Sequence, residues 1–204
     1  MHDVTQYPFV FFPVGLNLRG RTCVVIGDDR EAVEKAAALE EAGAAVRRIA
    51  DAASFRDDDL RDAFFVVSTP NDETLSARLR GLADRKRFLL CTIDQPRYGF
   101  VAMQAVAKTG PVRIAVSTGG IAPRVGRRFR EALQRVLDAR FLRFINCLNA
   151  QRERNRLRLP SPAERRRAML DVCEGFSVGV SLRYPAWFEQ SEASRGPQVR
   201  DGER

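Results

Sequence analysis

Short apolar runs alternate with helical patterns across the first hundred residues. The runs TCVVIG, AAVRRIAD, FFVVST and RFLLCTID have the length and composition of buried strands. Residues 30–43 place alanine and leucine at helical spacing and end at Gly43, where a C-terminal cap belongs. Residues 70–86 form a second helical pattern, with Asn71 and Asp72 as candidates for its N-cap. This alternation predicts an α/β fold with a parallel, doubly wound sheet.

The pattern changes near residue 104. Residues 98–118 resemble two strands around the turn KTGP, and residues 121–151 have the pattern of one helix. The prolines of LPSPAE end that helix, and AERRRAM begins another. We therefore expect a domain boundary near residue 104, and we expect the polar residues 191–204 to form a disordered tail.

Composition narrows the class of protein. Hydrophobic residues make up 45% of the 204 residues and charged residues 29%, which is typical of soluble globular proteins. No apolar run reaches the roughly 18 residues of a membrane span, and the first twenty residues lack the pattern of a secretory signal. The four separated cysteines favour buried free thiols in a reducing cytoplasm. The only histidine is His2, which argues against zinc catalysis and against Ser-His or Cys-His mechanisms.

The net charge of +8 is carried mainly by arginine, most densely between Arg124 and Arg167. Such an excess suggests a polyanionic partner, which includes nucleic acid, phosphate and polycarboxylates. A solvated helix surface explains the same pattern equally well. No aromatic residues are placed to stack bases beside these arginines, so we do not expect a nucleic-acid partner.

The turn after the first run contains Gly27, Asp28 and Asp29. In a dinucleotide-binding turn, glycines let the chain bend and let the pyrophosphate approach the backbone. Here a carboxylate occupies the middle glycine position, and either aspartate could cap the following helix itself. Two interpretations stay open: a cofactor binds through backbone N–H groups, or the protein's own anion fills the site.

Two later motifs carry candidate chemistry. Asp94 ends the fourth strand at the carboxyl edge of the predicted sheet, where it is either a general base or a turn aspartate. In VSTGGIAPRVGRR, the Gly-Gly turn before a helix could hold an anion, with arginines one turn further on. The alternative is a Ser or Thr cap on a basic helix. Arg47 and Arg48 follow the second strand, and they either meet the 2′-phosphate of NADP or lie on the surface.

Together these motifs resemble the precorrin-2 dehydrogenase and sirohydrochlorin ferrochelatase family, the N-terminal module of siroheme synthases. The shared order is P-V-x-x-x-L, V-V-I-G, E-x-G-A, a T-x-N-D-like strand end, a strand-end Asp, and V-S-T-G-G-x-x-P-x-x-x-R-x-x-R. The resemblance runs from about Phe12 to Phe176. It departs from the family pattern at Asp28 and Asp29, at Cys91 and at Gln104.

The resemblance implies a Rossmann-like NAD-binding domain over residues 1–104, a dimerisation region over 105–140 and a small helical domain over 141–190. It implies a homodimer that oxidises precorrin-2 with NAD, with ferrous iron as a further substrate in some members. Asp94 matches the catalytic aspartate. The residues expected to bind the tetrapyrrole are Ser117, Thr118, Gly119, Gly120, Arg124, Arg127 and Arg128. Those expected to bind NAD are Gly27, Asp28, Asp29, Arg30, Glu31, Asp51, Ala52, Asn71 and Asp72. No metal ligands are expected.

The alternative is a relative that keeps the fold and binds a tetrapyrrole or metal but has lost NAD binding. The two aspartates of the first turn are the reason to keep this alternative. A nucleic-acid-binding or scaffolding role is the third possibility.

Overall fold

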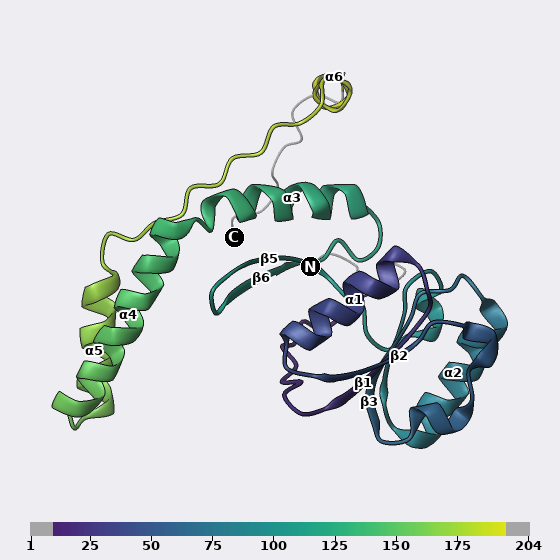
Figure 1. The fold of residues 1–204 in the computed structure, drawn as a ribbon. Helices are drawn as coiled ribbons and strands as arrows, with labels where there is room; N and C mark the ends of the chain where they lie inside the picture. Colours follow the sequence, from purple (N-terminus) through teal and green to yellow (C-terminus); the bar gives the residue numbers. More distant parts are fainter. Residues whose placement is uncertain (1–9, 195–204) are drawn as a thin grey trace, which may run out of the picture. The chain divides into compact units, whose positions relative to one another are not determined.

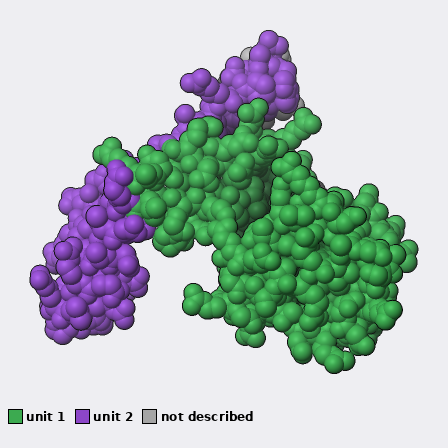
Figure 2. Space-filling model, viewed as in Figure 1, with its two compact units in different colours: residues 1–142 green, residues 143–204 purple. Residues whose placement is uncertain are grey.

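The computed structural model describes residues 10–194 and divides into two compact units, Met1–Leu142 and Arg143–Arg204 (Figure 2). The first unit contains a four-stranded parallel sheet, a two-stranded sheet and helices α1 to α3 (Figure 1). The second contains most of α4, together with α5 and α6.

The parallel sheet has the strand order β2-β1-β3-β4. Its elements, in chain order, are β1 (Thr22–Ile26), α1 (Arg30–Glu41), β2 (Ala45–Ile49), the 3₁₀ turns η2 (Ala52–Ser54) and η3 (Asp57–Leu60), β3 (Ala63–Ser68), α2 (Glu73–Lys86) and β4 (Leu89–Thr92). The predicted strands and helices are therefore confirmed, and the fold is Rossmann-like. Asp72 caps α2 by accepting a hydrogen bond from the Leu75 N–H, and Gly43 adopts a positive φ of 86° just after α1.

Alternate residues of the strands pack against opposite helices. Val24 and Val66 point to the cluster that contains Leu79 of α2. Val25 and Val67 point to the cluster that contains Ala36 of α1. Because side chains alternate across a strand, each face of the sheet is covered by one helix, which is the doubly wound arrangement that the alternation predicts.

A β-hairpin and a helix follow the sheet. After the 3₁₀ turn η4 (Pro96–Tyr98), β5 (Ala105–Thr109) pairs antiparallel with β6 (Val112–Val116), and α3 (Pro123–Val136) packs on both strands. The hairpin turns at Gly110 and Pro111, within the KTGP pattern, as predicted. β5 starts at Ala105, next to the position where the sequence pattern changes, and the domain boundary expected there stays a prediction.

The helix expected over residues 121–151 is wrong in its continuity. The chain forms α3 and then α4 (Ala139–Arg158), with a break at Leu137 and Asp138. The side chain of Asp138 accepts a hydrogen bond from the Phe141 N–H, as an N-cap does, and this starts a second helix. The second helix also runs beyond residue 151, because no proline interrupts it before Pro160.

In the second unit, α4 is followed by α5 (Pro162–Cys173) and α6 (Ala186–Ser194). Ser161 caps α5 by accepting from the Glu164 N–H. Residues 191–194, which we expected to be part of a disordered tail, complete α6, whereas residues 195–204 lie outside the described part of the chain.

All four cysteines are free thiols, as predicted, but only Cys23 and Cys91 are buried. The apolar runs around Cys147 and Cys173 belong to helices whose cysteine positions face solvent, so periodicity misassigned their burial. Within residues 10–194, no helix combines the length and the hydropathy that a membrane span needs.

Candidate active site

The carboxyl ends of β1 and β3 meet at Gly27 and Thr69, at the point where the strand order reverses. Gly27 has φ 133°, and a Cβ atom at this position would lie 2.1 Å from the Thr69 Oγ1 atom. Its N–H donates to the Ile49 carbonyl at the end of β2. Only glycine fits here, and open α/β sheets bind their ligands in this crevice.

A hollow of about 510 Å³ opens beside this turn. Its lining residues are Gly27, Asp28, Ala50, Asp51, Ala52 and Pro70. Four of these, Gly27, Asp28, Asp51 and Ala52, were predicted from the sequence as cofactor-binding residues. The hollow therefore has the position of a dinucleotide site.

The side chains of the two aspartates of the turn lie in different surroundings. Asp29 is the N-cap of α1, and its Oδ1 atom accepts from the Ala32 N–H at 2.6 Å. Asp28 is exposed and lines the hollow. The next residue, Arg30, points to solvent and pairs with Glu34 at 2.8 Å. The backbone N–H groups of Arg30 and Glu31 have no acceptor within the helix, because they lie in its first turn, so they are available to an anion.

Three other predicted cofactor residues, Asp51, Asn71 and Asp72, make hydrogen bonds within the protein. Asp51 caps η2 by accepting from the Ala53 N–H at 2.9 Å through one carboxylate oxygen. Asp72 caps α2, and the Asn71 Oδ1 atom accepts from Gln95 at 2.7 Å. Arg47 donates to the Asp59 carbonyl at 2.6 Å and does not line the hollow.

A second cavity, of about 430 Å³, lies between the carboxyl end of β4 and the loop after β6. Its lining residues are Phe11, Glu31, Lys35, Cys91, Thr92, Ile93, Pro96, Val101, Ala102, Met103, Gln104, Ala105, Val116, Ser117, Thr118, Gly119, Gly120, Pro123 and Gly126. The structure thus brings the whole Ser117–Gly120 motif to the strand end that carries Asp94.

Asp94 lies at the rim of this cavity. Its neighbours Ile93 and Pro96 line the cavity, whereas Asp94 itself is exposed and is not among the lining residues. The Ile93 N–H donates to the Ser68 carbonyl at 2.9 Å, and the Thr92 hydroxyl donates to the Gln95 carbonyl at 2.6 Å. These two bonds hold the bend that carries the Asp94 carboxylate.

The loop Ser117–Gly120 depends on its glycines. Gly119 and Gly120 have positive φ angles of 60° and 79°, and the Ser117 hydroxyl accepts from the Gly119 N–H at 3.3 Å. The N-cap of α3 is Ala122, which makes no side-chain hydrogen bond. The interpretation of Ser117 or Thr118 as a helix cap is therefore wrong, since the loop turns before α3 begins. Gly126 of α3 packs against the Thr118 side chain instead.

The arginines of α3 were expected beside the Gly-Gly turn, but their side chains do not line the cavity. Pro123 and Gly126 are the residues of α3 that line the cavity, while Arg124, Arg127 and Arg128 are exposed. Arg127 pairs with Glu131 at 3.0 Å. The lining includes a charged residue that sequence reasoning missed, Lys35, whose signal was its spacing of four residues from Glu31 on α1.

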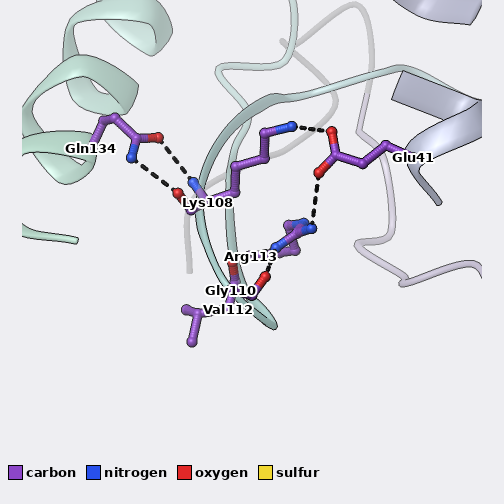
Figure 3. Close-up of polar contacts among 6 residues, drawn as sticks. All are labelled: Glu41, Lys108, Gly110, Val112, Arg113 and Gln134. Atoms are coloured by element: carbon purple, nitrogen blue, oxygen red, sulfur yellow. Dashed lines mark hydrogen bonds and ion pairs between the residues drawn. The ribbon is translucent and has the colours of Figure 1, made fainter. Parts of the chain in front are cut away.

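A polar cluster connects α1 to the hairpin (Figure 3). The Glu41 carboxylate accepts from the Lys108 ammonium and from the Arg113 guanidinium. The hydrogen bond from Lys108 is the main reason that the pKa of Glu41 lies below its usual value. The Gln134 amide of α3 both accepts from the Lys108 N–H and donates to the Lys108 carbonyl, each at 3.0 Å. These contacts hold the hairpin, and with it the loop after β6, beside the sheet.

Two further observations bear on the chemistry. Burial raises the pKa of the Cys91 thiol, so this cavity residue is a neutral thiol near pH 7 and not a nucleophile. Among residues 10–194, no group of three or more His, Cys, Asp or Glu side chains is placed to hold a metal ion.

Comparison with known proteins agrees with this geometry. Residues 14–105 match the family described as "Putative NAD(P)-binding". A siroheme synthase of Nitrosospira multiformis is 27% identical over 220 residues, a match that spans 95% of this chain and 47% of the relative. A siroheme synthase of Neisseria meningitidis serogroup C is 28% identical, with 94% of this chain and 44% of the relative covered. The chain thus spans about half the length of the curated relatives it matches.

A solved structure with a similar fold is SirC, a precorrin-2 dehydrogenase. The two structures superpose with a TM-score of 0.66 at 19% sequence identity, covering 81% of this chain and 90% of the other. At 19% identity, the superposition supports a shared fold and nothing about activity. Residues 14–105 are thus similar to a family of NAD(P)-binding domains, and most of the chain is similar in sequence to siroheme synthases.

Proposed function

We propose that this chain is a cytoplasmic, homodimeric enzyme that oxidises precorrin-2 to sirohydrochlorin with NAD, a step of siroheme biosynthesis. The observation that carries the proposal is the second cavity. It joins the strand end that carries Asp94 to the Ser117–Gly120 loop, which is separated from it by more than twenty residues of chain. Both motifs were assigned to one substrate by resemblance alone, and they border the same space.

The oxidation removes one hydrogen as hydride and one as a proton. NAD, when bound, supplies the hydride acceptor. The Asp94 carboxylate accepts the proton, because it stands at the cavity rim on a bend fixed by Thr92 and Ile93. The Gly119 N–H donates to the Ser117 hydroxyl, so the backbone N–H group of Gly120 is the donor of this turn that is left for a carboxylate arm of the tetrapyrrole.

The first hollow fits the adenosine half of NAD. Gly27 leaves no side chain between the turn and Thr69, and Asp51 has its second carboxylate oxygen free of the bond to Ala53 for a ribose hydroxyl. An acidic residue there favours NAD over NADP, because it repels a 2′-phosphate. Asp29 is turned onto its own helix, so Asp28 is the carboxylate that faces the pyrophosphate position.

The direct test mixes purified protein with precorrin-2 and NAD and follows the absorbance of sirohydrochlorin. We expect product and NADH in equal amounts. A folded protein that binds both compounds and forms no product would refute the dehydrogenase activity.

The alternative function is a tetrapyrrole-binding or metal-inserting relative without a redox step. Asp28 in the hollow is the specific observation in its favour, because a carboxylate about 4 Å from a phosphate is repelled by roughly 4 kcal/mol at an effective dielectric near 20. Titration of the protein with NAD in a calorimeter separates the two. Binding of NAD with a micromolar Kd excludes a relative that has lost NAD binding. Ferrous iron added with sirohydrochlorin then tests for chelation on its own.

A further inference from the structure

Lys35 is the one cationic side chain among the described residues that line the second cavity. Its side chain is 25% exposed and its Nζ atom lies 3.1 Å from the Glu31 Oε1 atom. Both residues stand beside the buried stripe Ala32, Ala36 and Leu39, which seats α1 on the sheet. The helix phase therefore aims this ion pair along the sheet face towards Cys91 at the end of β4, whose pKa responds to both charges.

We infer that Lys35 is a binding residue for a carboxylate of the substrate. Without substrate, the Lys35 ammonium pairs with Glu31, and the substrate carboxylate takes the place of the Glu31 carboxylate. The inference rests on the proposed function, whose tetrapyrrole bears eight carboxylates. A half-buried ammonium gains more from a carboxylate than an exposed arginine does, because less water screens the pair.

The arginines of α3 do not meet this requirement within one chain. Arg127 forms an ion pair with Glu131, and its side chain is 77% exposed. Arg124 and Arg128 are exposed and absent from the cavity lining. Lys35 shares the cavity with the Ser117–Gly120 loop, so one arm of the substrate can reach the ammonium while another reaches the Gly-Gly turn.

Because of Glu31, the two charge-removing substitutions are expected to change the Kd of the substrate in opposite directions. Glu31 competes with the substrate carboxylate for the same ammonium. Removing the lysine charge must therefore weaken binding, whereas removing the glutamate charge must strengthen it. A purely structural ion pair on α1 predicts the same direction for both changes.

The experiment measures the Kd of sirohydrochlorin by absorbance titration of the full chain without NAD, at low and at high salt. We expect Lys35→Gln to raise the Kd about 10- to 100-fold at low salt, as loss of a charged hydrogen bond does. Lys35→Arg should restore most of the affinity. We expect Glu31→Gln to lower the Kd several-fold.

Matched controls separate local from general charge effects. Arg61→Gln removes one exposed positive charge from the same unit, and Glu34→Gln breaks the outer ion pair of α1. Both should leave the Kd within about twofold of wild type. If wild type binds sirohydrochlorin and Lys35→Gln matches Arg61→Gln, the inference is wrong and the proposed function stands. If wild type binds no tetrapyrrole, the proposed function fails and the inference fails with it.

Discussion

At the scale of single residues, the proposed NAD site depends on the two aspartates of the turn after β1. Asp28 and Asp29 are adjacent in sequence and alike in chemistry, but the structure gives them separate tasks. Asp29 stabilises α1, while Asp28 faces the hollow.

Replacement Asp28→Gly should therefore tighten NAD binding by tenfold or more, since it removes the carboxylate nearest the pyrophosphate position and exposes the backbone N–H groups. Calorimetric titration measures this Kd. Asp29→Ala is the matched control, and it should cost about 1 kcal/mol of folding stability through loss of the cap. Equal NAD affinity in wild type and Asp28→Gly would contradict the assignment of this carboxylate.

Gly27→Ala tests the crevice itself. The added methyl would meet the Thr69 hydroxyl, and alanine disfavours a φ of 133°. We expect a loss of roughly 1–3 kcal/mol in the free energy of unfolding, measured by urea denaturation. The double variant Gly27→Ala/Thr69→Ala should recover part of the loss by removing the hydroxyl. No recovery would assign the whole cost to backbone strain.

At the scale of elements, the hairpin must stay beside the sheet for the cavity to exist. Two helices hold it: α1 through Glu41, and α3 through the Gln134 amide, which satisfies the Lys108 backbone as a neighbouring strand would (Figure 3). The loop Ser117–Gly120 follows the hairpin directly, so these contacts also set its place.

Glu41→Gln should loosen the hairpin, seen as faster hydrogen exchange over residues 105–116. The folded-state pKa of Glu41 is lowered, so its contribution is present above the unfolded pKa of about 4.3 and disappears as the pH falls through the folded value. The difference between wild type and variant should therefore vanish in acid. Glu131→Gln, which breaks ion pairs within α3, should leave exchange in the hairpin unchanged. A difference that persists in acid would rule out the Glu41 charge as its cause.

At the scale of the whole molecule, the family resemblance implies a homodimer built on residues 105–140. Val125 and Val136 lie on one side of α3 and are 48% and 58% exposed, and Val106 of β5 is 38% exposed. Exposed apolar side chains on a hairpin and on its covering helix suit a protein interface.

Light scattering should give the wild-type chain twice its 22.9 kDa mass. Val125→Asp should shift it towards monomer, because a carboxylate buried in an apolar interface is costly. The circular dichroism spectrum should not change, since Val125 faces away from the hairpin core. Exposed Leu157→Asp in α4 is the matched control outside this region. A wild-type monomer would disprove the predicted dimer.

The sequence by itself determined the strands and helices of the parallel sheet, their order, and the hairpin that follows. Strand lengths, helical spacing, the Asp72 cap and the turn before β6 are local properties, and each depends on residues within a few positions of one another. Which residues line the site depended on contacts between segments that are far apart in the sequence. Which aspartate caps α1, and whether Arg124 or Lys35 lines the cavity, follow from the phase in which each helix packs on its sheet. That phase is set by buried residues such as Ala36, which packs with residues from other parts of the chain, so only the tertiary structure decided it.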